Sequence, residues 1–216
     1  MRRLAAGAFA LALAALPAAA SADLFSSVSY GAHVSTTGIG LTLEKPILYD
    51  FSVRLTTNNL SVSQSMLYDN QPYASTNKYQ NFGVIADFRP YAGRWRISGG
   101  LLFGSDYVRN TLRAGGSSVN VGGSVYPTAG AGNVTSTVHF DRPTIYAGVG
   151  TGTGLIRGTA LTFDAGLEIR NGVASAAATG PLASDPAFAA SLGALAGELR
   201  TRIVSPSLSV GLVYRP

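Results

Sequence analysis

The sequence lacks cysteine and contains few charged residues. The absence of cysteine among the 216 residues excludes a disulfide scaffold, a thiolate metal site and a cysteine nucleophile. Only 12% of the residues are charged, about half the fraction that is usual in soluble domains. Lysine occurs only at Lys45 and Lys78, and the arginines are scattered, so we expect no nucleic-acid partner. The many phenylalanine and tyrosine residues exclude a disordered chain.

The N-terminal segment has the three parts of a secretory signal peptide. A basic start at Arg2 and Arg3 precedes an Ala/Leu run, and small residues before Asp23 are typical of a cleavage site. We therefore predict a signal peptide over residues 1–22 and a mature domain over residues 23–216. The alternative is an N-terminal anchor helix. The absence of cysteine at the cleavage point excludes lipoprotein processing.

After Asp23 the chain lacks any run of 18 apolar residues, yet it remains apolar. Apolar and polar residues instead alternate with period two, which is typical of half-buried strands. Seven segments show this pattern: 39–44, 51–56, 82–89, 95–104, 145–150, 161–170 and 208–215. We predict an all-β fold, in which strands of about ten residues form a closed transmembrane barrel.

The connections alternate in length. Residues 45–50, 90–94 and 153–158 are short connections, whereas residues 66–77, 110–135 and 172–202 form long ones. Outer-membrane barrels have short periplasmic turns and long outer loops. This orientation requires one further strand, over residues 26–33, with a hairpin near residues 35–37. The prediction is an eight-stranded antiparallel barrel.

One short helix is predicted in the last long loop. Asp185 is a good N-cap, and Pro186 suits the first helical position. Phe188, Leu192 and Leu195 then recur at helical spacing. Such a helix packs within its own loop, docks on the barrel rim or a partner, or only extends the hairpin.

The polar positions of the strands indicate which face meets lipid. A soluble barrel needs a densely charged exterior, whereas the polar positions here are mostly Gly, Ser and Thr with few charges. They suit the crowded interior of a small barrel, with the apolar positions facing lipid. Aromatic residues near the short turns and the C-terminus predict an interfacial girdle, although aromatic residues also favour strand ends. The girdle comprises Tyr49, Phe51, Phe88, Tyr91, Trp95 and Tyr214.

Three segments resemble known outer-membrane barrels. The C-terminal residues Gly211-Leu212-Val213-Tyr214-Arg215 resemble the final strand of such proteins in proteobacteria. The segments 88–101 and 146–166 resemble a family of small outer-membrane proteins of unassigned function, similar in architecture to the outer-membrane protein A barrel. The resemblance implies location in the cell outer membrane and recognition of the last strand by the barrel-assembly machinery. Pro216 departs from the terminal phenylalanine of that pattern.

The inward positions carry eight charged residues: Glu44, Arg54, Asp87, Arg89, Arg96, Asp164, Glu168 and Arg170. Charges in a narrow, poorly hydrated interior must pair. We predict an ion-pair network that fills the lumen; the alternative is a narrow pathway for ions or small solutes, gated by rearranged pairs. Eight strands leave no room for a wide porin channel.

His33 and Ser35 are the only pair that suggests catalysis. The segment His33-Val34-Ser35 is similar to the His-x-Ser element of outer-membrane lipid A deacylases, but it lies on the first strand and Thr36 follows it. We treat a lipid A-modifying enzyme as an alternative and predict a non-enzymatic barrel with a structural or surface-interaction role. No cofactor or metal is expected. The expected partners are outer-membrane lipid, lipopolysaccharide and the assembly machinery, and we expect a monomer.

Overall fold

The computed structural model describes residues 27–68, 71–90, 93–113, 117–140, 143–156, 158–199 and 202–216. The predicted signal peptide and the predicted girdle residue Tyr91 lie outside the described residues. No helix in the described part of the chain is long and apolar enough to cross a membrane.

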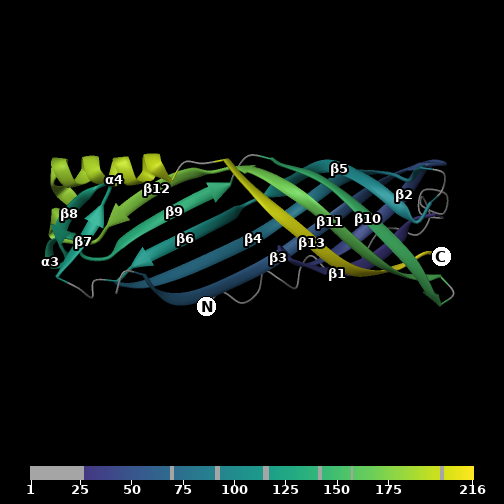
Figure 1. The fold of residues 1–216 in the computed structure, drawn as a ribbon, viewed down its shortest axis with the longest axis horizontal. Helices are drawn as coiled ribbons and strands as arrows, with labels where there is room; N and C mark the ends of the chain where they lie inside the picture. Colours follow the sequence, from purple (N-terminus) through teal and green to yellow (C-terminus); the bar gives the residue numbers. More distant parts are fainter. Residues whose placement is uncertain are drawn as a thin grey trace, which may run out of the picture.

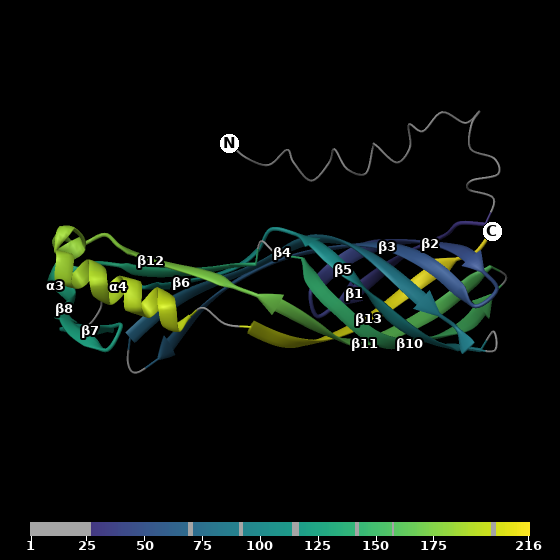
Figure 2. The same ribbon diagram turned by 90° about the horizontal axis from the view of Figure 1, so that it is seen from above.

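Eight strands form a ring of antiparallel pairings (Figures 1 and 2). Starting at β4, the pairings pass through β3, β2, β1, β13, β11, β10 and β5 and return to β4. The strands are β1 (Ser29–Ser35), β2 (Gly38–Leu48), β3 (Phe51–Tyr68), β4 (Gln71–Phe88), β5 (Trp95–Gly104), β10 (Thr144–Ile156), β11 (Thr159–Asn171) and β13 (Arg202–Tyr214). All seven alternating segments lie largely within these strands, and the turn between β1 and β2 falls where it was expected.

Three further strands extend the sheet beyond the ring. They are β6 (Asp106–Leu112), β9 (Val134–Phe140) and β12 (Val173–Ala178), and they follow β4 in the order β6, β9, β12. The sheet therefore has 11 strands, and the predicted total of eight is not confirmed. We call these three strands, the outer halves of β3 and β4, and the described residues of 113–133 and 179–199 the extension. It projects from the barrel end opposite the short turns (Figure 1).

The described residues of the three predicted long loops belong largely to strands, helices and turns, so the prediction of loops there was wrong. Residues 66–77 belong mostly to the β3–β4 hairpin, whose register runs without interruption from Phe51 opposite Phe88 to Tyr68 opposite Gln71. Residues 110–135 contain the hairpin β7 (Ser118–Val121) and β8 (Ser124–Pro127) and the turn α3 (Thr128–Ala131). Residues 172–202 contain β12, the 3-10 turn η2 (Pro181–Ser184) and the helix α4 (Pro186–Glu198).

The predicted helix is confirmed, and it packs within the extension. The Asp185 carboxylate caps α4 by accepting hydrogen bonds from the backbone nitrogens of Ala187 and Phe188. One face of α4 lies beside β12 (Figure 2) and contributes to an apolar core. That core contains Leu112, Val119, Val121, Ala131, Val134, Phe188 and Leu192. The extension thus has a hydrophobic core of its own.

The barrel is apolar outside and polar inside, as the alternation predicts. Large apolar side chains are exposed on its outer surface, among them Ile39, Leu41, Phe51, Phe82, Ile97, Leu101, Ile145, Phe163, Leu167, Leu208, Val210 and Leu212. The intervening positions are buried and mostly polar. A soluble barrel would have the opposite distribution, because a continuous apolar belt is unstable in water. The exposure therefore contradicts a soluble barrel and indicates a lipid-facing belt.

Candidate functional site: the barrel interior

The inward charges gather around Arg54, in the half of the barrel nearer the short turns. Arg54 Nε lies 2.9 Å from Asp87 Oδ2, and Arg54 Nη1 lies 3.5 Å from Asp164 Oδ2. Arg96 Nη2 lies 2.6 Å from the same Asp164 oxygen. Ser98 Oγ donates a further hydrogen bond to Asp87. Four strands are therefore joined across the lumen by two arginines and two carboxylates.

A second group lies beside the first. The Glu44 carboxylate pairs with Arg89, and Ser52 Oγ donates to Glu44 Oε1 at 2.9 Å. Arg89 Nη1 also donates to Ser52 Oγ at 2.8 Å. Ser52 thus bridges the pair, and each of these groups has a partner in an interior where an isolated ion would cost several kcal/mol.

The third group lies at the junction with the extension. Arg170 pairs with Glu168 on its own strand and with Asp106 on β6, at 3.6 Å. Its guanidinium lies 4.8 Å from the ring centre of Tyr79 and 5.9 Å from that of Phe140. All eight predicted lumen charges are therefore in ion pairs. Sequence analysis missed Asp106, because residues 106–112 show no alternation that would place it inside.

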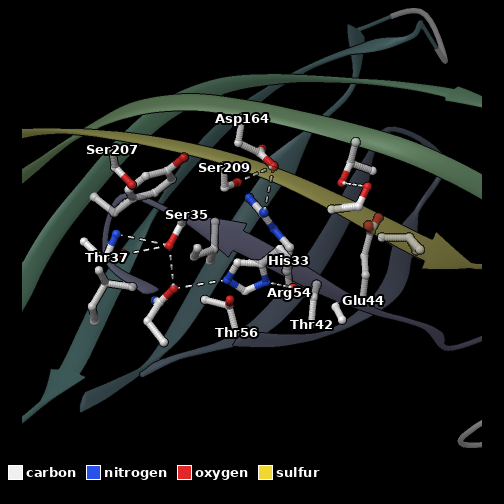
Figure 3. A pocket seen from close by; sticks show the side chains of 18 of the residues that line it. His33, Ser35, Thr37, Thr42, Glu44, Arg54, Thr56, Asp164, Ser207 and Ser209 are labelled. Carbon is white, nitrogen blue, oxygen red and sulfur yellow. Dashed lines mark hydrogen bonds and ion pairs between the residues drawn. The ribbon is translucent and has the colours of Figure 1, made fainter. Parts of the chain in front are cut away.

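His33 and Ser35 also point into the lumen (Figure 3). His33 Nε2 and Ser35 Oγ lie 3.1 and 3.3 Å from the side-chain oxygen of Asn58. The Asn58 amide nitrogen donates to Asn81, whose own nitrogen donates to Asp106. The Asn58 oxygen therefore accepts from His33, whereas the single hydroxyl proton of Ser35 can reach either this oxygen or the backbone oxygen of Gly38, which is nearer at 2.9 Å. The lipid A hypothesis requires this pair to reach the lipid headgroups at the outer rim, whereas the structure places it against Asn58 inside the barrel.

The pocket between the inward side chains is small. The cavity between these side chains offers about 50 Å³ to water-sized solvent, enough for a few water molecules. Its lining includes Asn58. Figure 3 shows His33, Arg54 and Asp164 in the same lining. No group of three or more metal-ligating side chains occurs in the described ranges. The interior can hold ordered water, and a solute larger than water would require the ion pairs to separate.

The predicted girdle residues that are described lie near the short turns or the C-terminus. The rings of Phe51 and Phe88 are 4.7 Å apart, and Tyr214 lies 5.4 Å from Tyr30. The side chains of Tyr49 and Trp95 are exposed. These rings border one end of the apolar belt, where amphipathic aromatic side chains favour the interface.

Comparison with known proteins identifies the architecture. No protein-family model and no curated protein matches the chain. The structure is similar to that of CarO2 from Acinetobacter baumannii, with a TM-score of 0.60 and 17% identity over 88% of this chain and 98% of that one. CarO from the same organism has a TM-score of 0.57 and 18% identity over the same shares of the two chains. A major outer membrane protein from Thermus thermophilus is also similar, with a TM-score of 0.45 and 16% identity over the same shares.

At this level of identity, the likeness to the two Acinetobacter proteins establishes the fold alone. The chain has the all-β architecture of an outer-membrane barrel protein, and its exposed apolar belt is consistent with that environment. Both observations support location in the cell outer membrane, as the sequence predicts. The finer likeness to the outer-membrane protein A barrel stays a prediction.

Proposed function

We propose that this protein is an outer-membrane barrel that anchors a rigid extension for surface interactions on the outside of the cell. The observation that carries the proposal is the apolar core of the extension, which includes Phe188, Leu192 and Val121. A segment that needed only to connect strands would not require such a core. A rigid scaffold that presents an ordered projection is a common arrangement for binding.

The lengths of β3 and β4 support the same conclusion. Each strand has 18 residues, which span about 60 Å when extended. About ten residues suffice to cross a membrane. The outer parts of both strands therefore extend well beyond the apolar belt, and they carry β6, β9 and β12 with them.

The packed lumen favours this role over a pore. Arg54, Arg96 and Asp164 lie across the interior, and the free space suits only a few waters. Catalysis on lipid is also disfavoured, because His33 and Ser35 point away from the belt. We therefore propose no enzymatic activity and no steady conductance.

Site-specific labelling tests the orientation. Because the sequence has no native cysteine, an introduced cysteine is the only thiol that can react with the label. Ser63→Cys is on the extension, and Arg94→Cys is beside a short turn. We expect a membrane-impermeant maleimide to label Ser63→Cys on intact cells and Arg94→Cys only after the outer membrane is permeabilised. The reverse pattern would overturn the outward orientation.

Planar-bilayer recording tests the interaction role against the pore. The refolded full chain should give no steady conductance, because Arg54, Arg96 and Asp164 lie across the lumen. Steady single-channel steps that change in Arg54→Ala would favour the pore instead.

A further inference from the structure

The outward face of the extension carries a basic and aromatic cluster. Lys78, Tyr107 and His139 lie directly opposite one another on β4, β6 and β9. Arg109 is two residues from Tyr107 on β6 and therefore shares its face. On β4 this is the face that carries Phe82 and Val84 in the barrel, so the cluster continues the lipid-facing surface upward.

Tyr107 holds the cluster together. The Arg109 guanidinium carbon lies 5.3 Å from the centre of the Tyr107 ring, within the range of a cation–π contact. The centres of the Tyr107 and His139 rings are 5.8 Å apart. Lys78 and Arg109 are diagonal neighbours, which are typically about 7–8 Å apart across a strand pair. Two long cationic side chains at that separation can reach one oxyanion group from both sides.

No described residue gives this face a compensating negative charge. Among the described outward positions of the extension on β3, β4, β6, β9 and β12, none is aspartate or glutamate. Asp106 precedes Tyr107 in the sequence, but its carboxylate is buried and pairs with Arg170 on the opposite face. The cluster is therefore a positive patch, and Arg109 is exposed to receive a ligand.

The height of the cluster corresponds to the headgroup layer. The stacked rings of Phe82 and Phe103, 5.4 Å apart, lie on the outer surface, and the outward positions above them on β4 are Gln80 and Lys78. Lys78 is ten residues along β4 from Phe88 at the end beside the short turn, and Arg109 lies opposite Thr76, two residues further. At about 3.3 Å per residue and the usual tilt of 45°, Lys78 lies about 23 Å and Arg109 about 28 Å above Phe88 along the membrane normal. The apolar band of such a barrel is about 25 Å tall, so with Phe88 at its inner edge both cations lie at its outer edge, beside the lipid phosphates.

We propose that Lys78, Arg109 and His139 bind a phosphate group of an outer-leaflet lipid, with Tyr107 positioning Arg109. The Arg109 guanidinium donates a bidentate pair of hydrogen bonds to two phosphate oxygens, and Lys78 supplies a second charge. His139 adds a ring N–H donor. This inference rests on the proposed function, because the patch meets the outer leaflet only if the extension points outward.

The test measures binding of lipid A that carries two, one or no phosphate groups to the folded full chain in detergent, by native mass spectrometry. The variant Lys78→Gln/Arg109→Gln removes both charges. The control Lys45→Gln/Arg94→Gln removes the same charge at the opposite end of the barrel, beside the short turns. Each cation at a membrane surface contributes about fivefold in affinity, so we expect the cluster variant to bind the bisphosphorylated lipid about 25-fold more weakly than the control. Tyr107→Leu, which keeps both charges, should lose about two- to fivefold.

Three outcomes would overturn the inference. The first is equal affinity in the cluster variant and its control, with both variants shown to be folded by a heat-modifiable gel shift. The second is equally tight binding of the lipid that lacks phosphate. The third is displacement of the lipid by inorganic phosphate at matched ionic strength, which would identify free phosphate as the ligand. A failure of the orientation itself would appear separately, in the labelling of Ser63→Cys.

Discussion

The carboxylate of Asp106 accepts a hydrogen bond from the backbone N–H of Gln80 at 2.8 Å, at the point where β4 exchanges one neighbouring strand for another. Below this point β4 pairs with β5, and above it β4 pairs with β6. The side chain satisfies a backbone donor at the junction, where the two ladders meet. The same carboxylate accepts hydrogen bonds from Asn81 and pairs with Arg170. Asp106 therefore couples the barrel to the extension.

We predict that Asp106→Leu destabilises the protein by about 1–3 kcal/mol, because it leaves the Gln80 backbone donor unsatisfied and removes one of the two carboxylates that pair with Arg170. Asp106→Asn retains an acceptor oxygen and should cost less. Urea unfolding of the protein in lipid vesicles measures both. Equal stability of Asp106→Leu and the native protein would show that the junction does not depend on this carboxylate.

The sequence predicted the barrel far better than the extension, and the reason is physical. Barrel strands face lipid on one side and a polar interior on the other, so residues such as Phe163 and Asp164 alternate sharply. The outer half of β3, with Ser61, Val62 and Ser63, is exposed on both faces and gives no such contrast. Its strand state comes from pairing with β4, which local periodicity does not reveal.

The lumen charges were predictable as a set, because each occupies one of the alternating polar positions of its strand. Their pairing was not predictable. Asp164 lies near Arg96 and Arg54 through the curvature of the barrel and the order of its strands, and 68 residues separate Asp164 from Arg96 along the chain. The inward direction of His33 follows from the same alternation of inward and outward positions. Sequence analysis did not apply this alternation to β1, because the strand is only weakly apolar.

The central ion pairs give a second prediction. Asp164→Asn should destabilise the barrel by about 3–5 kcal/mol, because Arg96 then lacks its buried carboxylate. The double variant Arg96→Met/Asp164→Leu should recover most of this loss, since a packed apolar pair carries no desolvation cost. A double-mutant cycle that adds the single variants Arg96→Met and Asp164→Leu, read from urea unfolding, measures the coupling. Additive effects of the two single changes would contradict a direct ion pair.

The lipid-facing register gives a third prediction. Leu101→Arg and Leu167→Arg place a charge in the apolar belt and should each cost about 2–4 kcal/mol. The matched control is Ser63→Arg, which lies on the exposed outer half of β3 and should be close to neutral. Folding efficiency into lipid vesicles, read from the heat-modifiable gel shift, compares the three. Normal folding of Leu101→Arg would mean that this face does not contact lipid.

The core of the extension gives the last prediction. The fully buried Phe188 ring contacts Tyr126 edge-on, with centres 4.7 Å apart, and joins α4 to the β7–β8 hairpin. Phe188→Ala should therefore cost about 3–5 kcal/mol locally and release α4. Asp185→Ala, which removes only the helix cap, should cost about 1 kcal/mol. Ala189→Ser, on the exposed face of α4, is the control.

Limited proteolysis of folded protein should cut the extension of Phe188→Ala much faster than that of the control, while the barrel keeps its gel shift. That separation is expected because the barrel strands satisfy their backbone hydrogen bonds within the ring and do not depend on α4. If Phe188→Ala instead abolished the gel shift, the barrel and extension would unfold as one unit, and the extension could not be a separately stabilised projection.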